Sequence, residues 1–301
     1  MSAPLLVVGH GTKDPAGVAG FLALVERARR RLAVQGVGAE GGFIELSAPA
    51  LTQAVEALWD GGHRRVAAVP LVLVGAGHAK GDIPGAMARE MVRRPGLSYS
   101  YGRPLGPHPI LLDLLAQRVD EALAGAPREG TTVLLVGRGS SDPDANAEVV
   151  KTARLLWEGR GYEGVETCFV SLAAPSVPAG LERARLLGAR RVVVAPYFLF
   201  RGVLPDRVDA QVLAWAADHP EVDVRVGAVL GDCDPLADLV LERYRESLAG
   251  DLRMNCDTCV YRTAMPGFER QVGAPQTPHD HPDDPTGAHG HGHGHGHGHE
   301  A

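Results

Sequence analysis

Two stretches of the sequence decide the fold. Residues 5–15 read LLVVGHGTKDP, and residues 133–143 read VLLVGRGSSDP. Each is an apolar run followed by Gly-X-Gly and then by Asp-Pro, a pattern typical of a buried strand, a turn and a helix start. At the helix start, Asp caps the first turn and Pro takes the first helical position. The same strand–turn–helix unit is therefore expected twice.

Two further pairs of segments extend this repeat. FIELSAPALTQAVEAL at residues 43–58 aligns with FVSLAAPSVPAGLERA at residues 169–184. RRVAAVPLVLVGAGH at residues 64–78 aligns with RRVVVAPYFLFRGVL at residues 190–204. All three matches occur in the same order, at offsets of 126 to 128 residues. Such ordered self-similarity indicates an internal duplication.

Each half alternates short apolar runs with longer helical stretches. In the first half, strands are expected near residues 4–9, 39–46, 65–73 and 97–102, and helices near residues 15–36, 48–60, 83–94 and 108–125. Uniformly apolar strands are typical of a parallel sheet covered by helices on both faces. We therefore predict an α/β fold of two similar, doubly wound parallel-sheet halves. The polar stretch AGAPREGT marks a boundary that gives halves at residues 1–127 and 128–250 and an extension at residues 251–301.

Composition excludes several classes of protein. The chain has 301 residues, enough for two modest domains, and a formal net charge of −6, which argues against nucleic-acid binding. No apolar run is long enough to predict a membrane span, and the N-terminus lacks the basic region of an export signal. Four cysteines do not suggest a disulfide framework. We expect a cytoplasmic protein that has no nucleic-acid or membrane partner.

Three potential metal ligands follow three strands of the first half. His10 comes after the first strand, Glu45 ends the second, and His78 lies in the Gly-rich loop after the third. Ligands of doubly wound sheets bind beyond the carboxyl ends of the strands, so these side chains can converge on one rim. Imidazole and carboxylate suit Co²⁺, Ni²⁺ or Fe²⁺, and neutral imidazole also accepts protons near pH 7. The sequence therefore predicts a metal site capable of proton transfer.

The second half lacks this set. Its residues at the aligned positions are Arg138, Ser171, and Leu204 or a near neighbour. Taken singly, His10 could be a turn residue, Glu45 a solvent-facing strand residue and His78 a surface residue. The Gly-His-Gly turn also lacks the full dinucleotide or P-loop pattern. At the matched strand ends, only the first half has His, Glu and His. This asymmetry favours a functional site in the first half.

The quoted segments, together with PLVLVGAGHAKGDIP at residues 70–84, resemble the N-terminal half of CbiX-type sirohydrochlorin chelatases. The long, two-unit form of that family also carries a Met-X-Cys-X-X-Cys segment, matched here by residues 254–259, and often a His-rich stretch. The resemblance covers nearly the whole chain. It implies a chelatase fold that binds the tetrapyrrole between the two halves. It also implies ATP-independent insertion of Co²⁺ into sirohydrochlorin for cobalamin biosynthesis, by a monomer whose duplication replaces a dimer.

The resemblance also implies residue roles. In the family, the positions of His10, Glu45 and His78 serve metal binding and proton removal. The substrate carries eight carboxylates, which suits arginine-rich walls. The candidate substrate contacts are Arg103, Arg138, Arg201 and Arg207.

The extension carries two further candidates. Cys256 and Cys259 correspond to the motif that long family members associate with an iron–sulfur centre, and a redox-active or metal-handling dithiol is the alternative. The Gly-His tail has no apolar periodicity, so we expect it to be disordered and to collect metal, although an expression tag would look similar. Its alternating histidines are His289, His291, His293, His295, His297 and His299.

Other functions remain open. A sirohydrochlorin ferrochelatase or nickelochelatase would use the same ligand types. A non-catalytic metal-storage protein or metallochaperone would explain the tail and the dithiol, but not the one-sided His/Glu/His set. A nucleotide-binding enzyme would require phosphate affinity.

Overall fold

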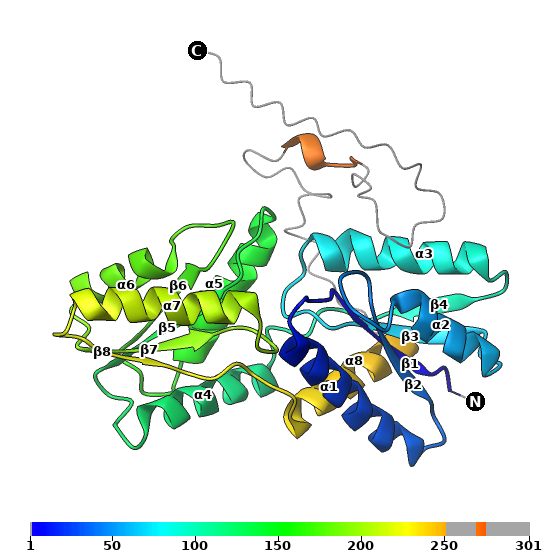
Figure 1. Cartoon of the computed structure of the whole chain (residues 1–301), viewed down its shortest axis with the longest axis horizontal. Coiled ribbons are helices and arrows are strands. Elements are labelled where there is room, and N and C mark those ends of the chain that lie inside the picture. Colours follow the sequence, from blue (N-terminus) through cyan, green and yellow to red (C-terminus); the bar gives the residue numbers. More distant parts are fainter. Residues whose placement is uncertain (1, 251–268, 275–301) are drawn as a thin grey trace.

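The computed structural model describes residues 2–250 and 269–274 (Figure 1). The first half contains β1 (Leu5–Gly9), α1 (Pro15–Ala33), β2 (Ala39–Phe43), α2 (Leu51–Asp60), β3 (Arg65–Pro70), a π-helical turn η1 (His78–Asp82), α3 (Ile83–Arg93), β4 (Ser98–Tyr101) and α4 (Pro109–Leu123). The second half contains β5 (Thr131–Gly137), α5 (Pro143–Trp157), β6 (Gly164–Phe169), α6 (Val177–Leu186), β7 (Arg191–Pro196), α7 (Val203–Asp218), β8 (Asp223–Val226) and α8 (Asp234–Ala249). A short 3₁₀ turn, η3, spans Glu269–Gln271.

Both halves form the same sheet. The strand orders are β2-β1-β3-β4 and β6-β5-β7-β8, and every strand pair is parallel. This arrangement confirms the predicted pair of doubly wound α/β halves. The carboxyl ends of the strands in each sheet therefore lie at one edge, where ligands of such folds bind. The tail that we expect to be disordered lies outside the described residues.

Strand periodicity divides the core between the two faces of each sheet. In β1, Leu5 and Val7 belong to one buried cluster, whereas Leu6 and Val8 belong to another. The first cluster runs through both halves and includes residues of α1, α4, α5 and α8. Each outer face has its own cluster, under α2 and α3 in the first half and under α6 and α7 in the second. The two halves thus share one continuous core on one side.

The last helix of each half packs on the other half. Helix α4 contacts β7, β8 and α5, whereas α8 contacts β3, β4 and α1. Figure 1 shows α8 lying with the N-terminal sheet. Arg243 of α8 is buried there and donates to the carbonyl oxygens of Pro104 and Leu105 at 3.0 and 2.8 Å. The boundary between residues 127 and 128 therefore separates the two sequence repeats. It does not separate the packing units, because α4 and α8 each pack on the other half.

The carboxyl edges of the two sheets face each other. Lys80, in the loop after β3, donates to Asp142 at 2.6 Å and to Asp144 at 3.1 Å, at the start of α5. On the other side of the contact, the carbonyl of Arg201, after β7, lies close to Gly17 of α1, where a Cβ would approach it to 3.0 Å. The strand-end loops of the two halves therefore line one cleft. No helix among the described residues is long and apolar enough to cross a bilayer.

Candidate active site

The turn after β1 brings His10 against Glu45. Gly11 has φ +114°, and a Cβ at this position would lie 1.8 Å from the carbonyl oxygen of Glu45. Glycine is therefore required for the loops after β1 and β2 to touch. His10 Nε2 then lies 2.8 Å from Glu45 Oε1, with both side chains about a quarter exposed, at 28% and 27%.

The π-helical turn places His78 beside His10. The two imidazole rings have centroids 4.0 Å apart and planes at 62°. His78 Nδ1 lies 2.5 Å from Oδ2 of the buried Asp82, four residues later in the same turn. Because π-turns inside helices are frequent at functional sites, this departure from the α-helix is itself informative. Two predicted ligands, His10 and His78, therefore meet in the cleft together with Glu45.

The contacts of the two histidines orient their rings. Nδ1 of His78 faces Oδ2 of Asp82, so the Asp82 side chain fixes the orientation of the His78 ring. His10 Nδ1 lies 3.1 Å from the carbonyl oxygen of Gly11, which can only accept. The other nitrogen of His10 faces Glu45, so the two side chains are in direct polar contact. A metal ion that binds at either group would have to break this contact.

The electrostatics keep His78 neutral at pH 7. Burial lowers the pKa of His78 below its ordinary value of 6.5, and the charges of His10 and Arg138 lower it further. The hydrogen bond and the negative charge of Asp82 act in the opposite sense. A neutral imidazole is the form that binds a metal or accepts a proton.

The arrangement is a hydrogen-bonded chain rather than a closed metal cage. Within residues 2–250 and 269–274, no three His, Cys, Asp or Glu side chains are grouped so as to hold a metal ion. His10 and Glu45 contact each other, and His78 is directed at Asp82. The roles of His10, Glu45 and His78 as joint metal ligands therefore remain a prediction.

The four candidate arginines differ in their surroundings. Arg103 makes two hydrogen bonds to Glu246 of α8, at 2.9 and 2.7 Å, and Arg201 is paired with Asp206 and with Asp209. Arg138 and Arg207 are exposed, and neither makes an ion pair or side-chain hydrogen bond to the described residues. Arg138 also lies near enough to lower the pKa of His78. Of these four arginines, Arg138 and Arg207 are thus the ones available to a ligand.

Two residues of the site had not been singled out from the sequence. Asp82 follows His78 by four residues, and a carboxylate at that helical spacing from a candidate ligand is a signal that sequence reasoning could have used. Lys80 lies between them and joins η1 to the C-terminal half through Asp142 and Asp144. No sequence pattern identifies that contact, because 62 residues separate Lys80 from its first partner.

The remaining predicted sites fall elsewhere in the chain. Cys256, Cys259 and the tail histidines lie outside the described residues. Of the cysteines that are described, Cys168 is buried in the second half, and burial raises the pKa of its thiol to about 12.

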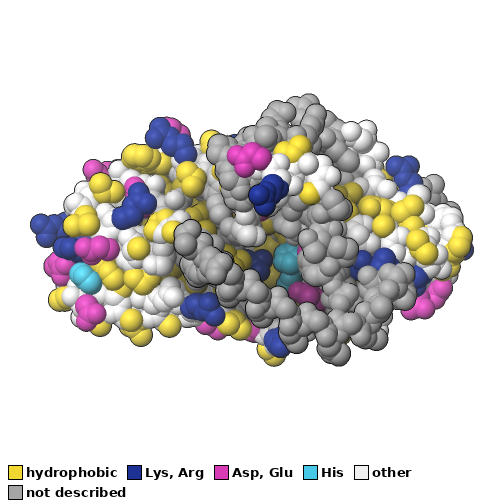
Figure 2. Space-filling model, turned by 90° about the horizontal axis from the view of Figure 1, so that it is seen from above, with side chains coloured by type: hydrophobic (Ala, Val, Ile, Leu, Met, Phe, Trp, Pro, Cys, Tyr) yellow, Lys and Arg dark blue, Asp and Glu magenta, His cyan; other side chains and the backbone are white. Residues whose placement is uncertain are grey.

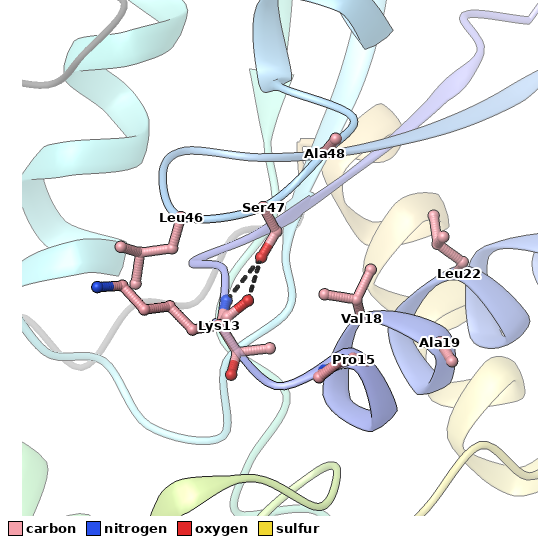
Figure 3. A pocket seen from close by; sticks show the side chains of 9 residues that line it. Lys13, Pro15, Val18, Ala19, Leu22, Leu46, Ser47 and Ala48 are labelled. Atoms are coloured by element: carbon pink, nitrogen blue, oxygen red, sulfur yellow. Dashed lines mark hydrogen bonds between the residues drawn. The ribbon is translucent and has the colours of Figure 1, made fainter.

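A space-filling view and a close-up show the surroundings of the strand-end loops. Figure 2 shows histidine side chains near the middle of the molecule, with Lys or Arg and Asp or Glu side chains beside them. A cavity of about 370 Å³ lies between the loop after β1, the start of α1 and the loop after β2. Figure 3 shows its lining, in which Leu46 and Lys13 lie side by side.

The same family model matches both halves. The model described as CbiX aligns with residues 4–122 and again with residues 132–247. The chain belongs to the CbiX family. This result confirms the resemblance drawn from the sequence motifs, and the double match agrees with an internal duplication.

Relatives of this CbiX-family chain carry specific names. It is 36% identical over 264 residues to the sirohydrochlorin cobaltochelatase of Priestia megaterium, covering 87% of this chain and 85% of that one. It is 35% identical over 246 residues to the sirohydrochlorin ferrochelatase of the same organism, covering 81% and 90%. The solved structure of SirB from Bacillus subtilis with Fe³⁺ superimposes with a TM-score of 0.73 at 31% identity, covering 83% of this chain and 97% of that chain.

Proposed function

We propose that this protein is a sirohydrochlorin cobaltochelatase, which inserts Co²⁺ into sirohydrochlorin without ATP in cobalamin biosynthesis. The observation that carries this proposal is the His10–Glu45 pair packed against His78 in the cleft of a chain that is 36% identical to a protein of that name. The divalent ion and the tetrapyrrole are the substrates. The reaction is that of a lyase, and the place of action is the cytoplasm.

The chemistry requires both metal binding and proton removal. Insertion of M²⁺ into the free-base ring forms four metal–nitrogen contacts and releases two pyrrole protons. The imidazole of His78, oriented by Asp82, would bind the metal or accept one of the two protons. The His10–Glu45 pair would hold the metal as it arrives and would accept the other pyrrole proton as the metal leaves. A loose site suits this task, because the ion must pass from the protein to the ring.

Arginines that lack protein partners are assigned to the substrate. Arg138, which follows β5, and Arg207, in the first turns of α7, belong to the second half and would pair with the peripheral carboxylates of the ring. Arg103 and Arg201 are weaker candidates, because Glu246 and two aspartates already engage them.

The extension is assigned to metal handling. Cys256 and Cys259 would contribute to an iron–sulfur centre, with a dithiol as the alternative. The optical and EPR spectra of anaerobically purified protein, compared with those of Cys256→Ser, separate the two. The tail histidines would raise the local metal concentration, so removal of residues 279–301 should lower the rate only when metal is scarce.

Sirohydrochlorin ferrochelatase is the second candidate, because the relative of that name is 35% identical to this chain. Imidazole and carboxylate ligands accept both ions, so the choice of metal must be measured. We propose cobalt because the alignment with the cobaltochelatase is longer, 264 residues against 246, and because the His-rich tail is typical of metal-collecting segments.

The test is an anaerobic absorbance time course of sirohydrochlorin with Co²⁺, repeated with Fe²⁺ and Ni²⁺. We expect the wild type to exceed the uncatalysed rate and His10→Ala to lose that excess. His63→Ala is the matched control, because His63 lies before β3, at the opposite edge of the sheet. If folded, metal-loaded protein gives no acceleration with any of these ions, metal storage or delivery becomes the better account. A light-scattering mass tests the expected monomer.

A further inference from the structure

Two leucines occupy the centres of matching tight turns. Leu46 has φ +62°, and Ser47 N–H donates to the carbonyl oxygen of Glu45 at 2.7 Å across it. In the second half, Leu172 has φ +58°, and Ala173 N–H donates to the carbonyl oxygen of Ser171, also at 2.7 Å. Both are γ-turns with positive φ at the central residue, a form that is rare and strained. A bulky side chain in that region of backbone space is a genuine outlier.

Neither leucine gains burial in return. The exposed fractions are 52% for Leu46 and 67% for Leu172. An apolar side chain that stands in water on a strained backbone contributes little to folding. Strain of this kind persists where the surrounding structure enforces it, and it concentrates at ligand sites.

The surrounding structure enforces both turns. A Cβ on Gly11 would lie 1.8 Å from the carbonyl oxygen of Glu45, and a Cβ on Gly139 would lie 1.7 Å from that of Ser171. These close approaches fix the carbonyl group that each turn uses. The duplication has therefore kept the same strained turn with the same leucine at its centre. The residue before each leucine nevertheless differs, being Glu45 in one half and Ser171 in the other.

The position of the leucines indicates what they contact. Leu46 directly follows Glu45 in the chain and lines a cavity at the strand-end loops, next to Lys13 (Figure 3). Leu172 directly follows Ser171, whose N–H donates to the carbonyl oxygen of Arg138. Both turns lie at carboxyl strand edges that face one another, so the leucines stand on opposite walls of the cleft.

We propose that Leu46 and Leu172 bind the flat macrocycle of the tetrapyrrole between them, one leucine against each face. This inference rests on the proposed function and adds two substrate-binding residues to it. The macrocycle is apolar on its faces and anionic at its rim. Lys13 and Arg138, which make no ion pair with the described residues, are placed beside the two leucines to meet carboxylates at that rim. The turns hold the leucines out before substrate arrives, which reduces the entropy lost on binding.

The experiment measures the dissociation constant of metal-free sirohydrochlorin by fluorescence quenching under anaerobic conditions. In Leu46→Gly and Leu172→Gly we expect affinity to fall about tenfold each, since burial of the exposed part of a leucine is lost. Because glycine adopts positive φ freely, the melting temperature should stay level or rise. A merely structural leucine would give the opposite pattern, with lower stability and unchanged affinity.

Further variants separate the side chain from the turn. Leu46→Asn tolerates the left-handed backbone but is polar, so it should weaken binding as glycine does, whereas Leu46→Met should keep affinity within about twofold. Leu187→Gly is the matched control, because Leu187 is 72% exposed and follows α6 as its C-cap, away from the strand-end loops. If the wild type binds and metallates sirohydrochlorin while the glycine variants bind it equally well, only this inference is overturned. A wild type that neither binds nor metallates it overturns the proposed function, and this inference with it.

Discussion

The loops after β1 and β5 have the same backbone and different chemistry. Gly11 and Gly139 have positive φ, and each makes a close approach to the carbonyl group of the next loop. His10 lies between β1 and Gly11, and the second half has Arg138 at the same place, between β5 and Gly139. Glu45 stands where the second half has Ser171.

This difference separates two requirements. The turn geometry was retained in both halves because the strand ends can approach each other only in that conformation. The side chains at the rim were free to diverge, and they now carry a His–Glu pair in direct contact on one wall and an exposed arginine on the other. A flat anionic ligand between them would have its reacting centre on one side and its charge recognised on the other.

The largest expected effect comes from making the first loop resemble the second. The variant His10→Arg with Glu45→Ser should lose about 10³-fold in kcat/KM for Co²⁺ insertion, because the imidazole and the carboxylate beside His78 are removed together. Its melting temperature should change little, since both side chains are partly exposed. The reciprocal change, Arg138→His with Ser171→Glu, should not restore activity in that background. Restoration would mean that the His78 loop is dispensable.

The next effect concerns the contact that joins the halves. Burial would lower the pKa of Lys80, but its hydrogen bonds to Asp142 and Asp144 outweigh burial and raise it. Lys80→Met leaves two buried carboxylates without their cation and should cost about 3 kcal/mol in the free energy of unfolding. Urea denaturation measures this cost. Adding Asp142→Asn and Asp144→Asn should recover part of it, and no recovery would contradict a charge-based role.

The aligned position in the second half provides the comparison for Lys80. Asp206 is exposed and pairs with Arg201 on its own side of the cleft. Asp206→Ala should therefore change the free energy of unfolding by less than about 1 kcal/mol. If Lys80→Met and Asp206→Ala lowered the free energy of unfolding equally, the two aligned positions would not differ in their contribution to stability.

A smaller effect is expected at Asp82, whose aligned residue in the second half is Val208. Asp82→Asn should reduce kcat/KM for Co²⁺ about 10- to 100-fold, because the group that orients the His78 ring becomes a weaker acceptor. Steady-state rates at varied Co²⁺ concentration test whether the loss in kcat/KM comes from a higher KM for the metal. Asp82→Glu should retain more activity than the asparagine variant, and equal losses would argue against an orienting carboxylate.

The smallest effect concerns the exchanged helix α8. Hydrogen bonding by Arg103 holds the pKa of Glu246 below its ordinary value of 4.5, against the opposing effect of burial, and Arg243 adds to the lowering. Because the folded-state pKa is depressed, the stabilisation is fully present above pH 4.5 and is lost as pH falls below it. Glu246→Gln should cost about 1 kcal/mol at pH 7 and flatten the pH dependence of stability in that acidic range. Thermal melts from pH 3 to 7 measure both the loss of stability and its pH dependence. If the variant loses stability with falling pH as steeply as the wild type, other carboxylates cause that loss.

Sequence patterns identified the parts of the site that depend on local order. The apolar runs, the Asp-Pro helix starts and the three ordered matches predicted the strands, the helix starts and the duplication. Asp14 and Asp142 do accept from the backbone of their helices. His10, Glu45 and His78 were found from their places at strand ends, because parallel strands bring those ends to one edge. That reasoning needs topology but no coordinates.

Long-range packing decided the rest. The sequence by itself determined two α/β halves and the chemistry of one rim, because hydrophobic periodicity and repeat order are written along the chain. Only the tertiary structure decided that α4 and α8 exchange halves, that Lys80 reaches Asp142, and that Leu46 and Leu172 are held outward in strained turns. Each of these depends on which surfaces bury each other. That choice is made by the packing of the whole chain and not by any segment of it.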